Sequence, residues 1–299
     1  MAVRAAFQST SGRGLDKSSP PMRLWQKAKR LGIWNPYDID LTQDEQDWNS
    51  LDPLEQDILL RLTSQFQAGE EAVTLDLLPL VAVIAGEGRL EEEIYLTSFL
   101  WEEAKHVEAF HRFYDEVARC HVDTSHFHGP NYRTLFYDEL PTALGRLRHD
   151  SSPVAQARAS VTYNLIVEGV MAETGYHAYY QVLKGRGIMP GTQQMVTYLK
   201  RDESRHLAYG VFLLSRLVAE HGDAVWDAIQ DQMQKLMLLP VGIIQEVFSA
   251  YETVPFGLRE EDFLNFAMTQ FESRITRIEK ARSQTIEQIY RAEELEVES

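Results

Sequence analysis

The pattern Glu-x-x-His occurs twice in this chain, at Glu103–His106 and again one hundred residues later at Glu203–His206. On an α-helix a spacing of three places both side chains on one face, so a carboxylate and an imidazole can bind one cation together. Helical bundles hold two cations when two such patterns are joined by one further Glu from each of two other helices. The pair of patterns therefore predicts an all-α chain built around a dimetal site.

The two further carboxylates can be located by their spacing. Glu70 lies 33 residues before Glu103, and Glu168 lies 35 residues before Glu203, so that the chain repeats one arrangement of Glu followed by Glu-x-x-His. A helix of about 30 residues, a turn and a second helix would account for each half. The pseudo-repeat predicts two antiparallel helix pairs that face each other across the metals.

Two neighbouring acids compete for the role of first ligand. Glu70 shares its helix face with three apolar residues, Phe66, Val73 and Leu77, whereas Glu71 shares its face with polar ones. An unpaired carboxylate that points into an apolar interior is costly, and a metal ion offsets that cost. We therefore select Glu70 and expect Glu71 to be solvated.

Three other candidate groups are weaker. Glu173 competes with Glu168, but only Glu168 preserves the pseudo-repeat. Glu108-Ala-Phe-His111 is a further Glu-x-x-His, yet it begins five residues after Glu103, on a different side of the same helix, and has no counterpart in the second half. The segment His-Phe-His at 126–128 falls in a predicted loop. We expect none of these groups to bind the metals.

Start and stop signals divide the rest of the chain into helices. Asp52-Pro53 and Ser152-Pro153 each place an N-cap before a proline at the first helical position. Alternating apolar patterns are almost absent, so strands should be absent or trivial. The expected helices are 22–31, 53–86 with a kink at Pro79, 89–119, a short one in the crossover at 131–148, 153–184, 191–221, 223–251 and 259–292.

Composition limits the class of protein. No linker separates the two halves, so residues 1–299 are expected to form one domain, with a flexible or surface-bound tail at 1–20 and a frayed end at 293–299. The net charge of −16 argues against nucleic acid as a partner. A single cysteine, Cys120, suits a reducing compartment, and no apolar run is long enough to span a membrane. The expected location is the cytoplasm.

The predicted ligand set is hard and rich in oxygen. Four carboxylates and two imidazoles suit iron and manganese better than zinc or copper. The predicted ligands are Glu70, Glu103, His106, Glu168, Glu203 and His206. A metal pair of this kind can activate dioxygen while the surrounding helices exclude water.

With these motifs the chain resembles the ferritin-like small subunits of class I ribonucleotide reductase and their relatives, from WNPYDIDLT through the four ligand helices. The resemblance implies a ferritin-like four-helix bundle with additional flanking helices. It also implies that Trp34 hydrogen-bonds Asp202, which in turn holds the metal-bound His106 as part of a second shell and electron path. Phe110 stands where the tyrosyl-radical subunits have a tyrosine, four residues after His106; manganese/iron reductase subunits also have phenylalanine there.

The segments QAGEEAVTLDLLP, WEEAKHVEAF, TYNLIVEGVMAETGY and DESRH are similar to the ligand-binding oxidase branch of this superfamily. That similarity implies one manganese ion, held by the first-half ligands, and one iron ion, held by the second-half ligands. It further implies a long-chain fatty acid bound at the metals and an ether cross-link between Val73 and Tyr163. Without the resemblance, both residues would be assigned to simple core packing.

The expected function is a dioxygen-dependent oxidase that removes hydrogen from C–H bonds. A lipid-like molecule is the expected target, and a homodimer supplied by an external electron donor is the expected assembly. One alternative is the metal-radical small subunit of a ribonucleotide reductase, which would need a partner subunit and a redox-active tyrosine near the C-terminus; Tyr290 is the only aromatic residue there. The other alternative is a metal or lipid binding protein without turnover.

Overall fold

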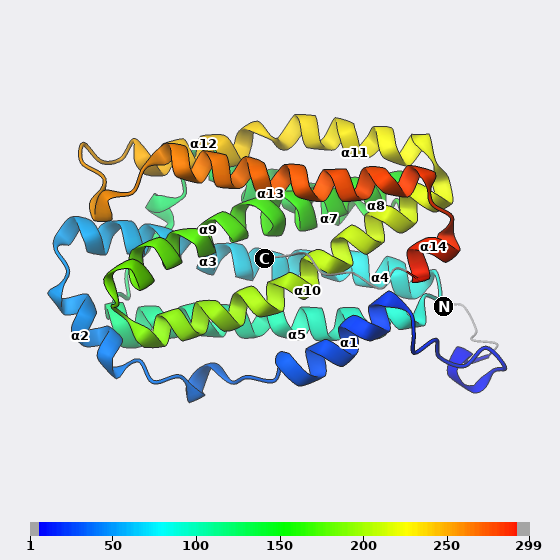
Figure 1. Ribbon diagram of the computed structural model, residues 1–299, viewed down its shortest axis with the longest axis horizontal. Coiled ribbons are helices and arrows are strands. Elements are labelled where there is room, and N and C mark those ends of the chain that lie inside the picture. Colours follow the sequence, from blue (N-terminus) through cyan, green and yellow to red (C-terminus); the bar gives the residue numbers. More distant parts are fainter. Residues whose placement is uncertain (1–5, 292–299) are drawn as a thin grey trace.

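The computed structural model describes residues 6–291, and within that range it contains helices and turns but no β-strand. Figure 1 shows the helices packed as a long bundle. Their bounds are α1 Pro20–Leu31, α2 Thr42–Ser50, α3 Pro53–Asp76, α4 Leu78–Gly86, α5 Leu90–Arg112, α6 Pro130–Arg133, α7 Leu140–Arg146, α8 Pro153–Ser160, α9 Glu173–Tyr179, α10 Pro190–His221, α11 Asp223–Leu236, α12 Leu238–Phe248, α13 Glu260–Lys280 and α14 Ile286–Arg291.

Short segments of other helical geometry connect these elements. The π-helical ones are Phe113–Ala118, Thr134–Glu139, Val161–Ala172 and Tyr180–Lys184. The 3-10 turns are Gln8–Thr10, Pro36–Asp38, Ser125–Phe127, Pro255–Gly257 and Ala281–Ser283. The predicted all-α fold is confirmed, and several predicted long helices are divided by these segments.

Local sequence explains where the ligand helices begin. The Asp52 side chain accepts hydrogen bonds from the backbone of Leu54 and Glu55, and Glu55 bonds back to the Asp52 N–H, which completes a capping box at the start of α3. Ser152 caps α8 through the Ala155 N–H, and Pro190 opens α10. Proline suits a first helical turn because its missing N–H has no partner there in any case.

Prolines also divide the predicted helices, slightly earlier than expected. The helix predicted over 53–86 breaks at Leu77, two residues before Pro79, so α3 ends at Asp76 and α4 begins at Leu78. A proline ring disturbs the turn that precedes it, which places the break on its N-terminal side. The helix predicted over 223–251 breaks in the same way at Met237, before Pro240. The last predicted helix ends early, at Lys280, and α14 follows a turn.

The largest departure from regular α-helix lies in the third ligand helix. The helix predicted over 153–184 is α-helical only at α8 and α9, and Val161–Ala172 between them is π-helical. π-helical turns are rare and occur mostly at functional sites. This segment carries two of the predicted site residues, Tyr163 and Glu168.

Four elements surround the centre of the bundle. α3 packs against α5, and α10 packs against the π-helical segment Val161–Ala172. α1 lies across α5 and α10 on one side, while α13 covers the π-helical segment on the other, with α11 and α12 beside it (Figure 1). A four-helix core with flanking helices is therefore the observed architecture, as predicted.

The described part of the N-terminal segment contacts the start of α5. Arg13 forms an ion pair with Glu91 at 3.0 Å, and the Asp16 N–H donates to the same carboxylate. Residues 1–5 of the predicted tail, and the predicted frayed end at 293–299, lie outside the described residues. Among the helices within residues 6–291, none has the length and apolar character needed to cross a bilayer.

Candidate dimetal site

The six predicted ligands meet in the centre of the bundle. Glu70 comes from α3, Glu103 and His106 from α5, Glu168 from the π-helical segment, and Glu203 and His206 from α10. They form two groups whose ligand atoms lie within 4.8 Å of one another: Glu70, Glu103, His106 and Glu203 in one, and Glu103, Glu168, Glu203 and His206 in the other. Glu103 and Glu203 belong to both groups, which is the position of bridging carboxylates.

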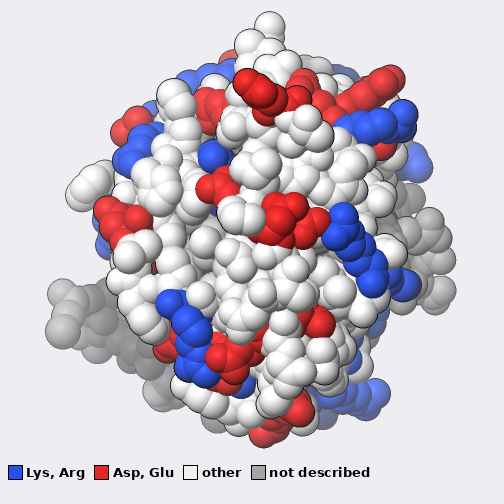
Figure 2. Space-filling model, turned by 90° about the vertical axis from the view of Figure 1, so that its left-hand side faces the viewer, with Lys and Arg blue, Asp and Glu red and all other residues white. Residues whose placement is uncertain are grey.

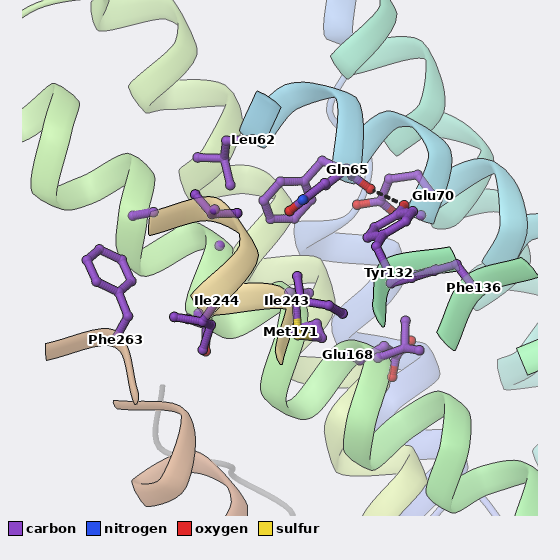
Figure 3. A pocket seen from close by; sticks show the side chains of 18 of the residues that line it. Leu62, Gln65, Glu70, Tyr132, Phe136, Glu168, Met171, Ile243, Ile244 and Phe263 are labelled. Atoms are coloured by element: carbon purple, nitrogen blue, oxygen red, sulfur yellow. Dashed lines mark hydrogen bonds between the residues drawn. The ribbon is translucent and has the colours of Figure 1, made fainter. Parts of the chain in front are cut away.

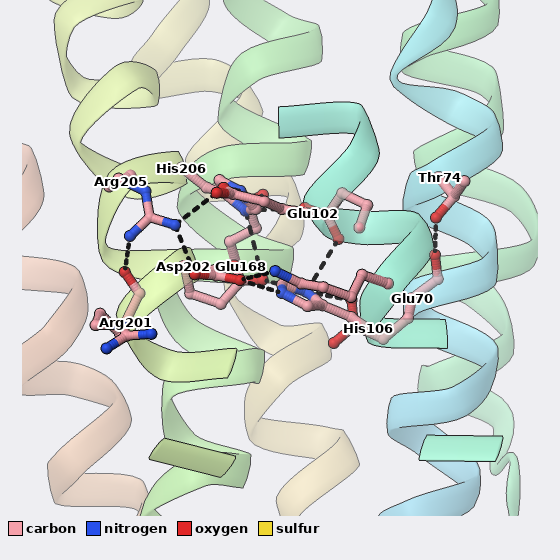
Figure 4. Close-up of polar contacts among 12 residues, drawn as sticks. Glu70, Thr74, Glu102, His106, Glu168, Arg201, Asp202, Arg205 and His206 are labelled. Atoms are coloured by element: carbon pink, nitrogen blue, oxygen red, sulfur yellow. Dashed lines mark hydrogen bonds and ion pairs between the residues drawn. The ribbon is translucent and has the colours of Figure 1, made fainter. Parts of the chain in front are cut away.

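The two imidazoles face the carboxylates with equivalent nitrogens. His106 Nδ1 lies 3.2 Å from Glu203 Oε1 and 3.5 Å from Glu70 Oε2. His206 Nδ1 lies 3.0 Å from Glu103 Oε1 and 3.8 Å from Glu168 Oε1. All six side chains are buried, and the two histidines have no exposed surface. Figure 4 shows His106 and His206 pointing toward each other across the carboxylates.

The unsatisfied atoms of this cluster fit metal ions. Both histidine Nδ1 atoms are buried without a hydrogen-bond partner, as are Oε2 of Glu103, Oε1 of Glu168 and Oε2 of Glu203. Buried polar atoms normally have partners because an unpaired one is costly. Two hard cations would supply those partners, and the oxygen-rich donor set suits iron and manganese.

The electrostatics of the cluster call for positive charge. Burial raises the pKa of Glu70 to about 8, even though His106 opposes the shift. Burial and the nearby Glu203 carboxylate raise the pKa of Glu168 well above its usual range. Burial alone would also raise the pKa of Glu103, but His206 and His106 hold it well below its usual range. Four carboxylates this close cannot all ionise without cations among them.

A second layer of charged groups orients both histidines. Asp202 Oδ2 lies 3.4 Å from His106 Nε2 and accepts a 2.8 Å hydrogen bond from the Trp34 indole. These contacts agree with those that the family resemblance implied for Trp34 and Asp202. Lys105 also donates to Asp202 Oδ2, at 2.8 Å. A hydrogen bond on the far ring nitrogen directs the other nitrogen toward a metal.

Sequence reasoning missed the matching partner of His206. Glu102 Oε2 lies 2.9 Å from His206 Nε2, and Arg205 joins Glu102 to Asp202 through contacts of 2.6 and 2.5 Å (Figure 4). The signal was present in the sequence, since an acidic residue precedes the Glu of both Glu-x-x-His patterns. Asp202 on α10 thus orients His106 on α5, and Glu102 on α5 orients His206 on α10.

We expect Glu102→Gln to weaken the metal site on the His206 side. The neutral amide cannot support the basicity of His206, and loss of such an outer partner typically lowers metal affinity about 10- to 100-fold. Titration against a competing chelator measures the change. Glu71→Gln is the matched control, because Glu71 is also a neighbour of a predicted ligand in the sequence, Glu70, but its side chain is exposed. Equal affinities in the two variants would contradict the assignment of Glu102.

The weaker sequence candidates lie outside the cluster. Glu71, Glu108 and His111 are exposed. Glu173 is buried, but its nearest cationic partner is Lys200, at 3.8 Å, and it belongs to neither ligand group. In the loop, His126 is exposed, and residues 126–128 belong to neither ligand group.

The pair proposed for the cross-link lies beside the ligands. The Tyr163 hydroxyl donates to Glu103 Oε1 at 3.1 Å and is fully buried. Val73 is buried on α3, one turn beyond Glu70. Phe110 stacks on Phe66 with ring centroids 4.8 Å apart, so the position occupied by tyrosine in radical subunits carries no hydroxyl group here.

An apolar cavity opens on the cluster. Its wall includes the carboxylates of Glu70, Glu103, Glu168 and Glu203, which lie together in the ligand cluster. Figure 3 shows Glu70 and Glu168 at one end and Leu62, Ile244 and Phe263 toward the other. The rest of the lining includes Phe66, Val73, Tyr132, Phe136, Val167, Met171, Ala172, Ala178, Ile243 and Val247. On the end of the molecule shown in Figure 2, acidic and basic side chains are scattered among uncharged ones, with acidic side chains near the centre of the view.

Comparisons with known proteins agree over nearly the whole chain. The family model described as ribonucleotide reductase, small chain, matches residues 21–283. An R2-like ligand-binding oxidase from Sulfolobus acidocaldarius is 39% identical, with a TM-score of 0.88, covering 96% of this chain and 99% of that one. An R2-like ligand-binding oxidase with aerobically reconstituted Mn/Fe cofactor is 37% identical, with a TM-score of 0.87, covering 92% and 98%. The similarity to these oxidases identifies an oxidoreductase.

Proposed function

The chain belongs to the ribonucleotide reductase small-chain family, and from this premise we propose that it is a dioxygen-dependent oxidase with one manganese and one iron ion. A long-chain fatty acid bound at the metals, an internal Val73–Tyr163 ether and C–H bond oxidation complete the proposal. It is supported by the similarity to ligand-binding oxidases, one of which carries a reconstituted Mn/Fe cofactor. A homodimer and a cytoplasmic location are also part of the proposal, and the single cysteine, Cys120, supports the location because it suits a reducing compartment.

The observation that carries this proposal is the junction of cavity and carboxylates. A long acyl chain fits the apolar wall, while its carboxylate would meet the end formed by Glu70, Glu103, Glu168 and Glu203. An acid group cannot rest against four carboxylates unless cations lie between them. Binding of the fatty acid carboxylate therefore requires the metal ions in this cavity.

The ligands divide between the two ions by the half of the chain from which they come. Glu70, Glu103 and His106 would hold manganese, and Glu168, Glu203 and His206 would hold iron, with Glu103 and Glu203 placed to bridge. When bound, such a pair supplies the redox chemistry that reduces dioxygen and oxidises a C–H bond. The protein positions the target carbon beside the metal site, because the buried helices hold that carbon in place and exclude water.

Val73 and Tyr163 would be the internal target. Forming the ether breaks one C–H bond of Val73 and the O–H bond of Tyr163 and creates one C–O bond. Two protons and two electrons leave the side chains, and dioxygen is the electron acceptor. Glu103 already accepts the hydrogen bond from the Tyr163 hydroxyl, so it is placed to receive the phenolic proton.

Bound lipid provides a test of the cavity. We expect denaturation and solvent extraction of the purified protein to release fatty acid in near-equal molar amount, as measured by mass spectrometry. Ala178→Phe should reduce this yield strongly, because Ala178 lines the cavity and an added ring fills space that the acyl chain needs. Metal content, measured in the same samples, should stay unchanged because Ala178 is not a ligand.

A matched control separates cavity filling from general damage. Leu238→Phe adds a ring at a position that is 76% exposed and should leave the fatty acid yield unchanged. Removing the metals with a chelator should lower lipid retention, because the carboxylate then loses its partners. Protein that yields no lipid with both metals in place would contradict the ligand-binding part of the proposal.

A further inference from the structure

A chain of packed aromatic rings leads away from the second metal site. The Phe99 ring is stacked on the His206 imidazole with centroids 3.7 Å apart and an angle of 9° between the planes. Beyond Phe99, the rings of Tyr95 and Tyr209 lie 6.1 and 6.5 Å away, and those two tyrosine rings are 5.2 Å apart. None of these side chains is exposed to solvent. Electrons cross such short gaps readily, so these rings form a route from the His206 imidazole into this cluster.

The two tyrosines differ in what their hydroxyl groups contact. The Tyr209 hydroxyl donates to Glu92 Oε2 at 3.0 Å, whereas the Tyr95 hydroxyl is buried without a hydrogen-bond partner. A phenol that loses an electron becomes strongly acidic, so its oxidation is easiest where a base already accepts its proton. Of this pair, only Tyr209 meets that requirement.

Glu92 is held in place as such a base. Its Oε1 lies 3.2 Å from Nε of Arg216, a residue with no exposed surface, and 3.9 Å from Nη1 of Arg89. Arginine does not give up its proton, so these contacts anchor the carboxylate without supplying an acid. Burial raises the pKa of Glu92, although Arg216 opposes the shift, and this makes it a stronger base than an exposed carboxylate.

The aromatic chain continues toward the surface. Phe212 lies 6.3 Å from Tyr209, and Tyr290 on α14 lies 5.4 Å from Phe212. Tyr290 is only partly buried, so solvent and soluble reductants can reach it. The described rings therefore link the environment of His206 to the outside through Tyr209.

We propose that Tyr209 is a redox-active residue that supplies an electron to the metal site when the Val73–Tyr163 cross-link cannot form. Tyr209 would give one electron to the metal site, and dioxygen reduced there would be the final electron acceptor. The Tyr209 O–H bond breaks, its proton forms an O–H bond on Glu92, and a neutral tyrosyl radical remains. An external one-electron reductant restores Tyr209 through Tyr290. This inference rests on the proposed oxidase function.

The test blocks the cross-link by removing the Tyr163 hydroxyl and looks for the radical. Tyr163→Phe protein, loaded with manganese and iron, is mixed with dioxygen, frozen rapidly and examined by electron paramagnetic resonance. We expect a tyrosyl signal that narrows when the protein contains ring-deuterated tyrosine. Adding Tyr209→Phe should abolish the signal. Adding Glu92→Gln should abolish the signal or shorten its lifetime, because the amide cannot accept the proton. Adding Tyr95→Phe, the matched control, should leave it in place.

The possible outcomes separate this inference from the proposed function. Wild-type protein from the same preparations is analysed by mass spectrometry for the Val73–Tyr163 link. The role of Tyr209 would be overturned if wild-type protein forms the link but the Tyr163→Phe protein gives no tyrosyl signal. A signal that survives Tyr209→Phe would overturn it as well. A Tyr209-dependent signal without the link would support Tyr209 and count against the cross-link. Absence of both would overturn both.

Discussion

Protein carrying Glu203→Ala is expected to purify without either metal ion. Glu203 belongs to both ligand groups, and its Oε1 lies 3.2 Å from His106 Nδ1 and 3.4 Å from His206 Nδ1. Its removal leaves each ion with fewer donors and takes away one of the two carboxylates that both groups share. Elemental analysis of the purified variant, per protein chain, measures the loss.

The matched control uses the Glu-x-x-His pattern that the structure leaves at the surface. Glu108 is exposed on α5, and Glu108→Ala should retain the full metal content of the wild type. Circular dichroism of both variants checks that the helices persist. Two ions retained in folded Glu203→Ala protein would sink the assignment of Glu203 as a shared ligand.

The helical architecture could be predicted from sequence because it depends on short-range signals. The cap-then-proline pairs Asp52-Pro53 and Ser152-Pro153 place the beginnings of α3 and α8 at the observed residues, and the predicted start at 191 lies one residue after the start of α10. Helix interruptions were harder to place. The break at Leu77 depends on how Pro79 disturbs the preceding turn, and the π-helical form of Val161–Ala172 has no short sequence signature.

The ligand cluster could be predicted because its residues repeat at helical spacing. Glu70 was separated from Glu71 by the apolar face that it shares, and the structure buries the first and exposes the second. Glu102 was missed because a Glu beside a ligand resembles any charged helix residue until its partner, His206, is known. The cavity could not be derived from sequence spacing, since its wall combines residues from α3, α9, α12 and α13 that meet only in the folded chain.

The same limit applies to the aromatic chain. Tyr95 and Tyr209 are separated by more than a hundred residues, and nothing in their local sequence sets them apart from ordinary core tyrosines. Their difference lies in one contact, the hydrogen bond from Tyr209 to Glu92. Chemistry that depends on a single long-range partner becomes visible only once the helices are placed side by side.

Assembly of the protein with manganese and iron in air is expected to lower its mass by two hydrogen atoms relative to protein assembled without dioxygen. The loss follows from joining the Tyr163 oxygen to a carbon of Val73. Both side chains are buried beside the ligands, with the Tyr163 hydroxyl 3.1 Å from Glu103 Oε1. Intact-protein mass spectrometry measures the change, and digestion should release one peptide pair that contains both residues.

Tyr163→Phe should abolish this mass change completely, because no phenolic oxygen remains to form the ether, while both metals are retained. Tyr179→Phe is the control: this tyrosine is equally buried, but its hydroxyl contacts Thr63 instead of a metal ligand. It should keep the cross-link. Fully metallated protein that has been exposed to dioxygen and still contains free Tyr163 would contradict the oxidase proposal. The radical-generating reductase subunit would then be the better interpretation of this metal site.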